Sequence, residues 1–281
     1  MGNLKNSAKE VSVSKNCHTC SSDGNYFKHR LGNYICGVIS LKSNYSEYKL
    51  ENSVTRMDEI LDTTDSEYKE VSNIPSRSQL SYANGFYVSC SALFVDIRKS
   101  SDLTDYHRNK VLSRIYRAYV SEAVALMNGN SDCVEINVVG DGVSGIFNTP
   151  YRENINTVFG TAFQISSLID ILNCRLKARN MKTLTVGIGA SYGSALMIMA
   201  GYKGSGINEV VWVGDVVNEA SNLSEFGNKT EQDCEIMVSN IFYDNLNDTN
   251  KKFLTKHPNR QCYHGNIISI SMNDWLKSNC P

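Results

Sequence analysis

The sequence predicts an α+β domain over residues 85–281, preceded by a polar extension and a helical lead-in segment. Of the 281 residues, 41% are hydrophobic and 20% are charged, which is enough apolar material for a sizeable core. From Gly85 onward, short apolar runs typical of strands alternate with longer stretches that have helical spacing. One large domain is therefore expected for most of the chain.

The two segments before this domain differ in composition. Residues 1–50 are rich in Ser, Asn, Lys and Tyr and predict an irregular, partly disordered extension. Residues 51–84 form the lead-in, in which Val54, Met57 and Ile60 share one face of a helix. The pattern breaks at Pro75, where a helix cannot continue.

The elements of the domain follow from the apolar runs in order. Strands are expected near 87–96, 134–139, 143–148, 184–190, 195–200, 208–213 and 234–239. Helices are expected over 101–128, 153–179, 216–226 and 240–247.

Charge and hydropathy exclude two classes of partner. Lys and Arg total 28 against 29 Asp and Glu, so no positive field exists to hold nucleic acid. The apolar runs, such as Ala195–Ala200, are far shorter than the ~20 residues that span a bilayer. The first residues lack the apolar stretch of a signal peptide. A cytoplasmic protein without a membrane partner is expected.

Nine cysteines are scattered through the chain, most of them in apolar runs. In a cytoplasmic protein most are expected to be reduced and buried. Cys17 and Cys20 form half of a zinc site that His29 and Cys36 would complete, although the chain has no second pair at this spacing.

An apolar strand that ends in a carboxylate is the first chemical signal. The first expected strand ends at Asp96, and Ile97 and Arg98 follow before Ser100 and Ser101 open the next helix. Asp96 is thus placed beside a helix N-terminus, where backbone N–H groups can hold a phosphate. Taken alone, Asp96 also fits an ordinary helix cap.

A tight turn between two apolar strands is the second signal. Gly140, Asp141 and Gly142 lie between the strands expected at 134–139 and 143–148, so Asp141 is at a hairpin tip. A strand, a long helix and a hairpin can bring both carboxylates to one edge of a sheet. Two carboxylates there suit a pair of Mg²⁺ ions that bind a triphosphate. Alone, Asp141 is equally an ordinary turn residue.

A third motif, Val211–Ser221, makes the pattern specific because it carries Gly-Asp followed by Asn218. With Phe94–Ile97 and Val138–Val143, in this order and spacing, it resembles the class III nucleotidyl cyclases over about residues 85–275. The three motifs together are specific, although each alone is weak.

The resemblance implies a fold and an assembly. The domain would be a ferredoxin-like βαββαβ unit with a central mixed or antiparallel sheet and flanking helices, and two copies would pair head to tail as a homodimer with active sites in the interface. Asp96 and Asp141 match the two metal-binding aspartates, and the Ile97 carbonyl completes the shell. Asn218 matches an asparagine that orients the ribose or transition state and comes from the partner chain.

Further segments resemble the bacterial pyrimidine cyclases of the Pycsar anti-phage systems. They are Ile74–Arg77, Asn84–Val88, Asp96–Arg98, Gly201–Gly206 and Tyr263–Asn266. This resemblance implies that the chain makes cyclic CMP or cyclic UMP during infection and that the product activates a separate effector. The sequence leaves the choice between CTP and UTP open.

The positions that read adenine in the purine cyclases are changed. Asn137 replaces a lysine, and Val211 replaces an Asp or Thr. Valine offers no side-chain hydrogen bond, which disfavours a purine edge. The Asn137 amide both donates and accepts, so it fits cytosine or, after an amide flip, uracil.

The arginine expected in the transition state of this family is also missing. Asn222 stands in its place, and His264 is the nearest match to a phosphate-binding lysine. Arg98 and Lys203 are the cations that can take over this charge, and each also fits a solvated surface residue.

The reaction implied by the resemblance is in-line attack of the substrate's own 3′-hydroxyl on the α-phosphorus, with two Mg²⁺ or Mn²⁺ ions per active site. The protein then supplies positioning and charge neutralisation rather than a nucleophile. Two alternatives stay open: a catalytically degenerate cyclase-like domain that binds a nucleotide, and a purine cyclase with unusual base contacts.

Overall fold

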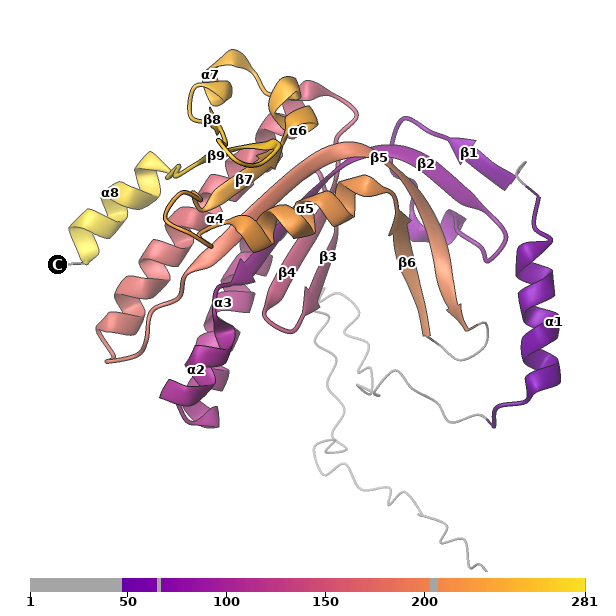
Figure 1. Ribbon diagram of the computed structural model, residues 1–281, viewed down its shortest axis with the longest axis horizontal. Helices are drawn as coiled ribbons and strands as arrows, with labels where there is room; N and C mark the ends of the chain where they lie inside the picture. The colour runs from indigo at the N-terminus through magenta and orange to yellow at the C-terminus, as the bar shows by residue number, and fades with distance from the viewer. Residues whose placement is uncertain (1–46, 65–66, 203–206, 281) are drawn as a thin grey trace, which may run out of the picture. The chain divides into compact units, whose positions relative to one another are not determined.

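The computed structural model describes residues 47–64, 67–202 and 207–280. Its strands, labelled in Figure 1, are β1 Tyr68–Glu70, β2 Gly85–Ile97, β3 Cys133–Val139, β4 Gly142–Asn148, β5 Val186–Tyr202, β6 Ile207–Val213, β7 Ile236–Ser239, β8 Thr255–Lys256 and β9 Cys262–Gly265. Its helices are α1 Leu50–Leu61, α2 Ser100–Tyr106, α3 Asn109–Asn128, α4 Arg152–Lys177, α5 Asp215–Phe226, α6 Asn240–Asn245, α7 Asp248–Lys251 and α8 Ile270–Asn279.

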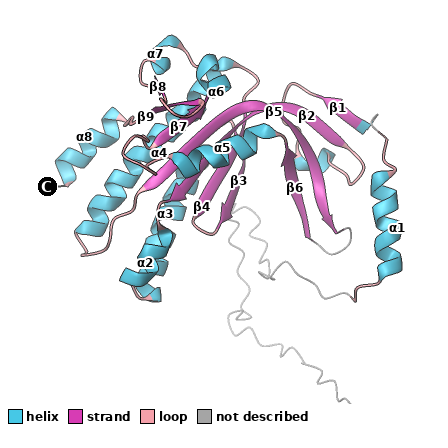
Figure 2. Cartoon of the chain, viewed as in Figure 1, coloured by secondary structure: helices cyan, strands magenta, loops and turns pink. Residues whose placement is uncertain are grey.

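One mixed sheet has the order β3-β4-β2-β5-β7-β9-β8, with β1 beside β2 and β6 beside β5. The sequence β2-α3-β3-β4-α4-β5 is a βαββαβ unit whose four strands are antiparallel to their neighbours. Figure 2 shows the two long strands β2 and β5 side by side through the middle of the sheet. The predicted α+β, ferredoxin-like fold is confirmed.

Helices cover both faces of the sheet (Figure 1). Side chains alternate along β2, so Leu93 and Val95 pack against α3 and α4 while Cys90 and Ala92 pack with residues of α5. In β5, a methyl group at either glycine facing α5, Gly187 or Gly189, would overlap the backbone of that helix. The glycines therefore let α5 lie directly on the sheet.

Two predicted boundaries were wrong. The helix expected over 101–128 is divided at His107 and Arg108, both of which have extended backbone. The His107 ring leaves the helical path and its Nε2 accepts a hydrogen bond from the Lys182 N–H at 3.0 Å. The strands expected at 184–190 and 195–200 are the single strand β5, because its pairing with β2 runs without a break across Gly193.

The described part of the chain has one helix, α4, with the length and mean hydropathy, 1.3, of a membrane span. In that stretch 56% of the residues are buried within the protein, as expected for the core helix of a folded domain.

The cysteines follow the expectation only in part. Cys90 and Cys262 are free and buried, as predicted. Cys174 at the end of α4 and Cys280 after α8 instead form a disulfide across a separation of 106 residues. The suggested zinc ligands Cys17, Cys20, His29 and Cys36 lie outside the described residues.

Glu235, which lies just before β7, should make the free energy of unfolding depend on pH. Burial, with the nearby Asp170 charge, raises the pKa of this carboxyl from 4.5 to about 7. The folded protein thus keeps a proton that the unfolded chain loses, so the free energy of unfolding falls as pH rises from 4.5 to about 7. Glu235→Gln should therefore be more stable than the unmodified protein by about 3 kcal/mol near pH 8, and nearly equal near pH 4.5.

Urea unfolding of both proteins at the two pH values measures this difference. A stability gain of the same size at both would contradict the assignment. Asp170→Asn, which keeps Glu235 and removes the neighbouring charge, should give a smaller gain.

Candidate functional site

Asp96 and Asp141 are brought together by the pairing of β2 with β4. Val95 lies opposite Val143, so the end of β2 is next to the turn that joins β3 to β4. Gly140 has a φ of 62°, a left-handed conformation that suits a two-residue hairpin turn. A Cβ atom at Gly142 would lie 3.9 Å from Asp96 Oδ1. The predicted meeting of strand end and hairpin tip is confirmed.

The charges around Asp96 make this edge of the sheet acidic. Burial raises the pKa of the Asp96 carboxyl, the Arg98 guanidinium opposes that shift, and the carboxylates of Asp141 and Glu225 add to it. Asp96 and Glu225 also line a cleft of about 370 Å³ with Ser221 and Ser224 of α5. An acidic cleft of this kind favours a cation.

Arg98 is held against this cleft. Its guanidinium donates to the Asp96 carboxylate and, at 2.7 Å, to the Glu225 carbonyl oxygen. Arg98 Nε is one of two buried side-chain N or O atoms without a partner in the described chain. Arg98 therefore ties the end of β2 to the end of α5, a contact that the sequence did not indicate.

The neighbours of Asp96 supply further oxygen and N–H groups. Ile97 is the last residue of β2 and its side chain is buried. Lys99 has a φ of 50°, and Ser100 and Ser101 begin α2 directly after it. Carboxylate and carbonyl oxygens are the ligands that Mg²⁺ and Mn²⁺ prefer, so this donor set fits such an ion in part. Within the described ranges no cluster of three or more His, Cys, Asp or Glu side chains has the arrangement of a metal site, and substrate phosphates would have to complete the shell.

Asn218 and Asn222 lie one turn apart on the exposed side of α5. They line a separate cleft of about 570 Å³, together with Glu219 and Arg260. The structure thus does not bring Asn218 to Asp96 of the same chain, and the two clefts lie along different sides of α5.

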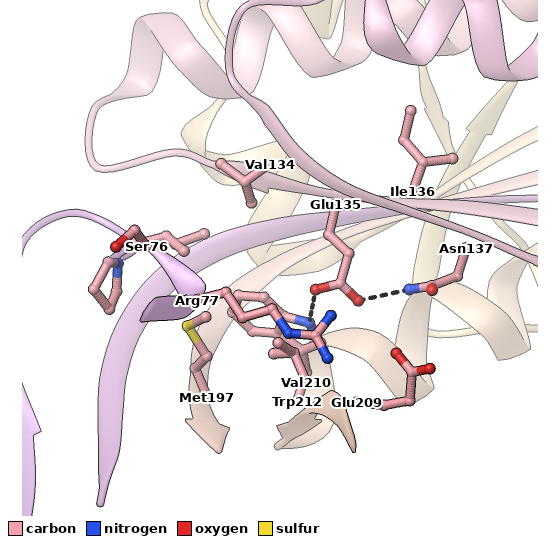
Figure 3. Close-up of a pocket in the computed structure, with 12 residues that line it drawn as sticks. Ser76, Arg77, Val134, Glu135, Ile136, Asn137, Met197, Glu209, Val210 and Trp212 are labelled. Atoms are coloured by element: carbon pink, nitrogen blue, oxygen red, sulfur yellow. Dashed lines mark hydrogen bonds between the residues drawn. The ribbon is translucent and has the colours of Figure 1, made fainter. Parts of the chain in front are cut away.

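Asn137 lies in a third cavity, of about 600 Å³ (Figure 3). Its Nδ2 donates to Glu135 Oε1 at 2.7 Å, and Trp212 Nε1 donates to Glu135 Oε2 at 3.2 Å. Both carboxylate oxygens are thereby used to orient protein groups. Val211 does not line this cavity; Glu209, Val210 and Trp212 of β6 line it instead.

Several residues of these sites were not found from the sequence. Glu135 belongs to no motif, Trp212 lies in the third motif without an assigned role, and the two meet only through the fold. His264, the nearest match to a phosphate-binding lysine, is buried in β9, and its Nδ1 accepts from the Cys234 N–H at 3.3 Å. Lys203 lies outside the described residues.

Comparison with known proteins shows the family of the chain. Residues 84–268 match the family model of the adenylate and guanylate cyclase catalytic domain. A uridylate cyclase of Treponema porcinum is 34% identical over 261 residues, covering 89% of this chain and 91% of that protein. A uridylate cyclase of Gulbenkiania mobilis is 37% identical over 259 residues, covering 85% of this chain and 100% of that protein.

Solved structures share the fold. The adenylyl cyclase CyaB from P. aeruginosa has a TM-score of 0.54 at 16% identity, covering 64% of this chain and 93% of that one. The guanylyl cyclase Cya2 has a TM-score of 0.53 at 16% identity, covering 63% of this chain and 85% of that one. The chain belongs to the adenylate and guanylate cyclase catalytic-domain family, the class III nucleotidyl cyclases.

Proposed function

We propose that the chain converts UTP to 3′,5′-cyclic UMP and pyrophosphate. The observation that carries this proposal is that Asp96 and Asp141 lie near each other at one edge of the sheet, in a chain whose curated relatives are uridylate cyclases. The 3′-oxygen of the ribose bonds to the α-phosphorus and loses its proton, and the bond from the α-phosphorus to the oxygen that bridges it to the β-phosphate breaks.

The acidic edge of the sheet would hold the divalent ions. Asp96, Asp141 and the Ile97 carbonyl offer hard oxygen ligands to two Mg²⁺ or Mn²⁺ ions. Bound there, the ions lower the pKa of the 3′-hydroxyl and neutralise the triphosphate. The backbone N–H groups of Ser100 and Ser101 follow directly in the chain and would bind a phosphate oxygen.

The active site would be completed by a second copy of the chain. Asn218 faces a different cleft from Asp96, so one copy alone does not present both to one substrate. A head-to-tail homodimer would place the Asn218 amide of one protomer over the carboxylates of its partner. With Asn222 in place of arginine, Arg98 is the cation nearest to the carboxylates, and its second role would be to offset charge on the phosphates.

Uracil recognition is supported by the orientation of Asn137. A carboxylate only accepts hydrogen bonds, so Glu135 holds Nδ2 toward itself and an amide flip would place two oxygens in contact. Asn137 Oδ1 is then directed away from Glu135 as an acceptor. Uracil offers a matching donor at N3–H.

The wider role follows the resemblance to the Pycsar cyclases. The cyclic nucleotide would serve as the signal of a bacterial anti-phage system and would bind a separate effector.

An assay with UTP, CTP, ATP and GTP in Mn²⁺ tests the proposal. We expect UTP to be converted at least tenfold faster than the purine nucleotides, since each lost base contact costs about 1–3 kcal/mol. Cyclic CMP as the main product would move the assignment to cytosine. Cyclic AMP or cyclic GMP as the main product would refute the pyrimidine assignment, and nucleotide binding without turnover would support a degenerate domain.

A further inference from the structure

The segment Ile74–Arg77 lies ahead of the part of the chain that matches the cyclase family, yet it forms one wall of the cavity that contains Asn137. Glu135 and Asn137 of β3 lie on the opposite wall, and Trp212 of β6 closes the cavity between them (Figure 3). Residues outside the catalytic domain thus complete a cavity within it.

This segment is fixed at both ends. Upstream, β1 pairs in parallel with β2, and the Val71 N–H donates to the Tyr87 carbonyl at 3.0 Å. The Ile74 N–H donates to Asn148 Oδ1 at 2.9 Å, and the Ile74 side chain packs against the same buried cluster as Trp212. Downstream, the Leu80 N–H donates to the Arg77 carbonyl at 3.1 Å, which closes a short 3₁₀ turn.

Arg77 is the one cationic residue among the described residues that line this cavity, and Glu135 and Glu209 are its acidic ones. Arg77 Nη2 donates to the Asn208 carbonyl of β6, the one hydrogen bond of its side chain within the described residues. The guanidinium is thereby anchored at one nitrogen and keeps further N–H groups, in a fixed plane, for an acceptor in the cavity.

The cavity therefore offers two complementary groups. Asn137 Oδ1 is an acceptor, because Glu135 holds its Nδ2. Arg77 is a donor that carries a full charge and cannot accept. An acceptor and a donor that line one cavity match the N3–H of a uracil ring and one of the two carbonyl groups beside it. Adenine has the reverse order on its corresponding edge, an acceptor at N1 in the ring and an amino donor outside it, so in the position of uracil it would face both protein groups with the wrong polarity.

We propose that Arg77 is a specificity-determining residue that donates a hydrogen bond to a carbonyl oxygen of the substrate's base. This inference rests on the proposed function, since it assigns the cavity to the base of the same substrate. The contact comes from a segment that lies outside the family match. The Arg77 hydrogen bond requires a base with a ring carbonyl.

The test compares three variants in the full chain. Arg77→Ala removes the donor, and Arg77→Lys restores a charge without the planar fork. Tyr82→Phe is the matched control, because the Tyr82 hydroxyl also bonds Asn208 through its side chain but does not line the cavity. For each, kcat and KM for UTP are measured together with the inhibition constant of ATP against UTP and the melting temperature.

We expect Arg77→Ala to lower kcat/KM for UTP about ten- to hundredfold, mainly through KM, because a hydrogen bond to a charged donor is lost. The inhibition constant of ATP should change by less than about twofold, because adenine does not use this contact. Arg77→Lys should recover part of the loss, and Tyr82→Phe should leave the ratio between the two nucleotides unchanged.

Arg77→Ala could weaken ATP inhibition as much as it lowers kcat/KM for UTP, or Tyr82→Phe could lower kcat/KM for UTP as much as Arg77→Ala does. Either result would show that Arg77 only holds β6 in place and would overturn the inference. If the unmodified protein makes no cyclic UMP or cyclic CMP, the proposed function itself fails. If the unmodified protein makes cyclic UMP and Arg77→Ala lowers kcat/KM for UTP without changing the inhibition constant of ATP, the proposed function and the role of Arg77 are both supported.

Discussion

Replacing Asp96 or Asp141 with alanine should abolish cyclisation while the protein stays folded and dimeric. The two carboxylates meet at the end of β2 and the β3–β4 turn, and both are exposed enough to bind ions. Losing either should unseat at least one ion and several kcal/mol of transition-state stabilisation, a loss of about 10³-fold or more in turnover. Product chromatography and the mass of the assembly in solution measure both effects.

Asp105→Ala is the matched control, since Asp105 is an exposed carboxylate of α2 that lines none of the three clefts. It should keep full activity. Near-normal turnover in the Asp96 or Asp141 variant would remove that residue from the ion-binding set.

A mixture of two inactive variants should recover activity if the site is shared between copies. Asp96→Ala and Asn218→Ala each damage both sites of their own homodimer. A mixed dimer, however, has one site with both residues intact, so equal mixing should restore about a quarter of the original activity. Turnover is measured after subunit exchange, over a range of mixing ratios.

Asp96→Ala mixed with Asp141→Ala provides the control, because every site in that mixed dimer lacks one carboxylate. It should stay inactive. If the first mixture also stays inactive after exchange has been verified, Asn218 acts with Asp96 of its own chain or does not act in the reaction.

The order of elements in the catalytic domain could be predicted because each apolar run produces one strand or helix that the sheet then pairs. The errors arose where a tertiary contact decides the local structure. His107 leaves the helix to accept from Lys182, a residue far along the chain. The strand β5 continues past Gly193 because β2 pairs with it on both sides of that residue.

The same limit applies to the site. Asp96 and Asp141 were found because a carboxylate at a strand end and one in a Gly-Asp-Gly turn are visible locally. Glu135 has no such signal: it becomes meaningful only when β3 places it between Asn137 and Trp212. Only the folded position of β6 shows that Trp212, rather than Val211, lines the cavity.

The parallel pairing of β1 with β2 has a consequence for how substrate choice can diversify in this fold. The wall that carries Arg77 is attached by backbone hydrogen bonds and by Asn148, while the ions would bind at a different edge of the sheet. Ser76 and Arg77 take no part in the β1–β2 pairing, and they line a different cavity from Asp96. Exchange of this short segment between homologous enzymes offers a modular route to new nucleotide preferences.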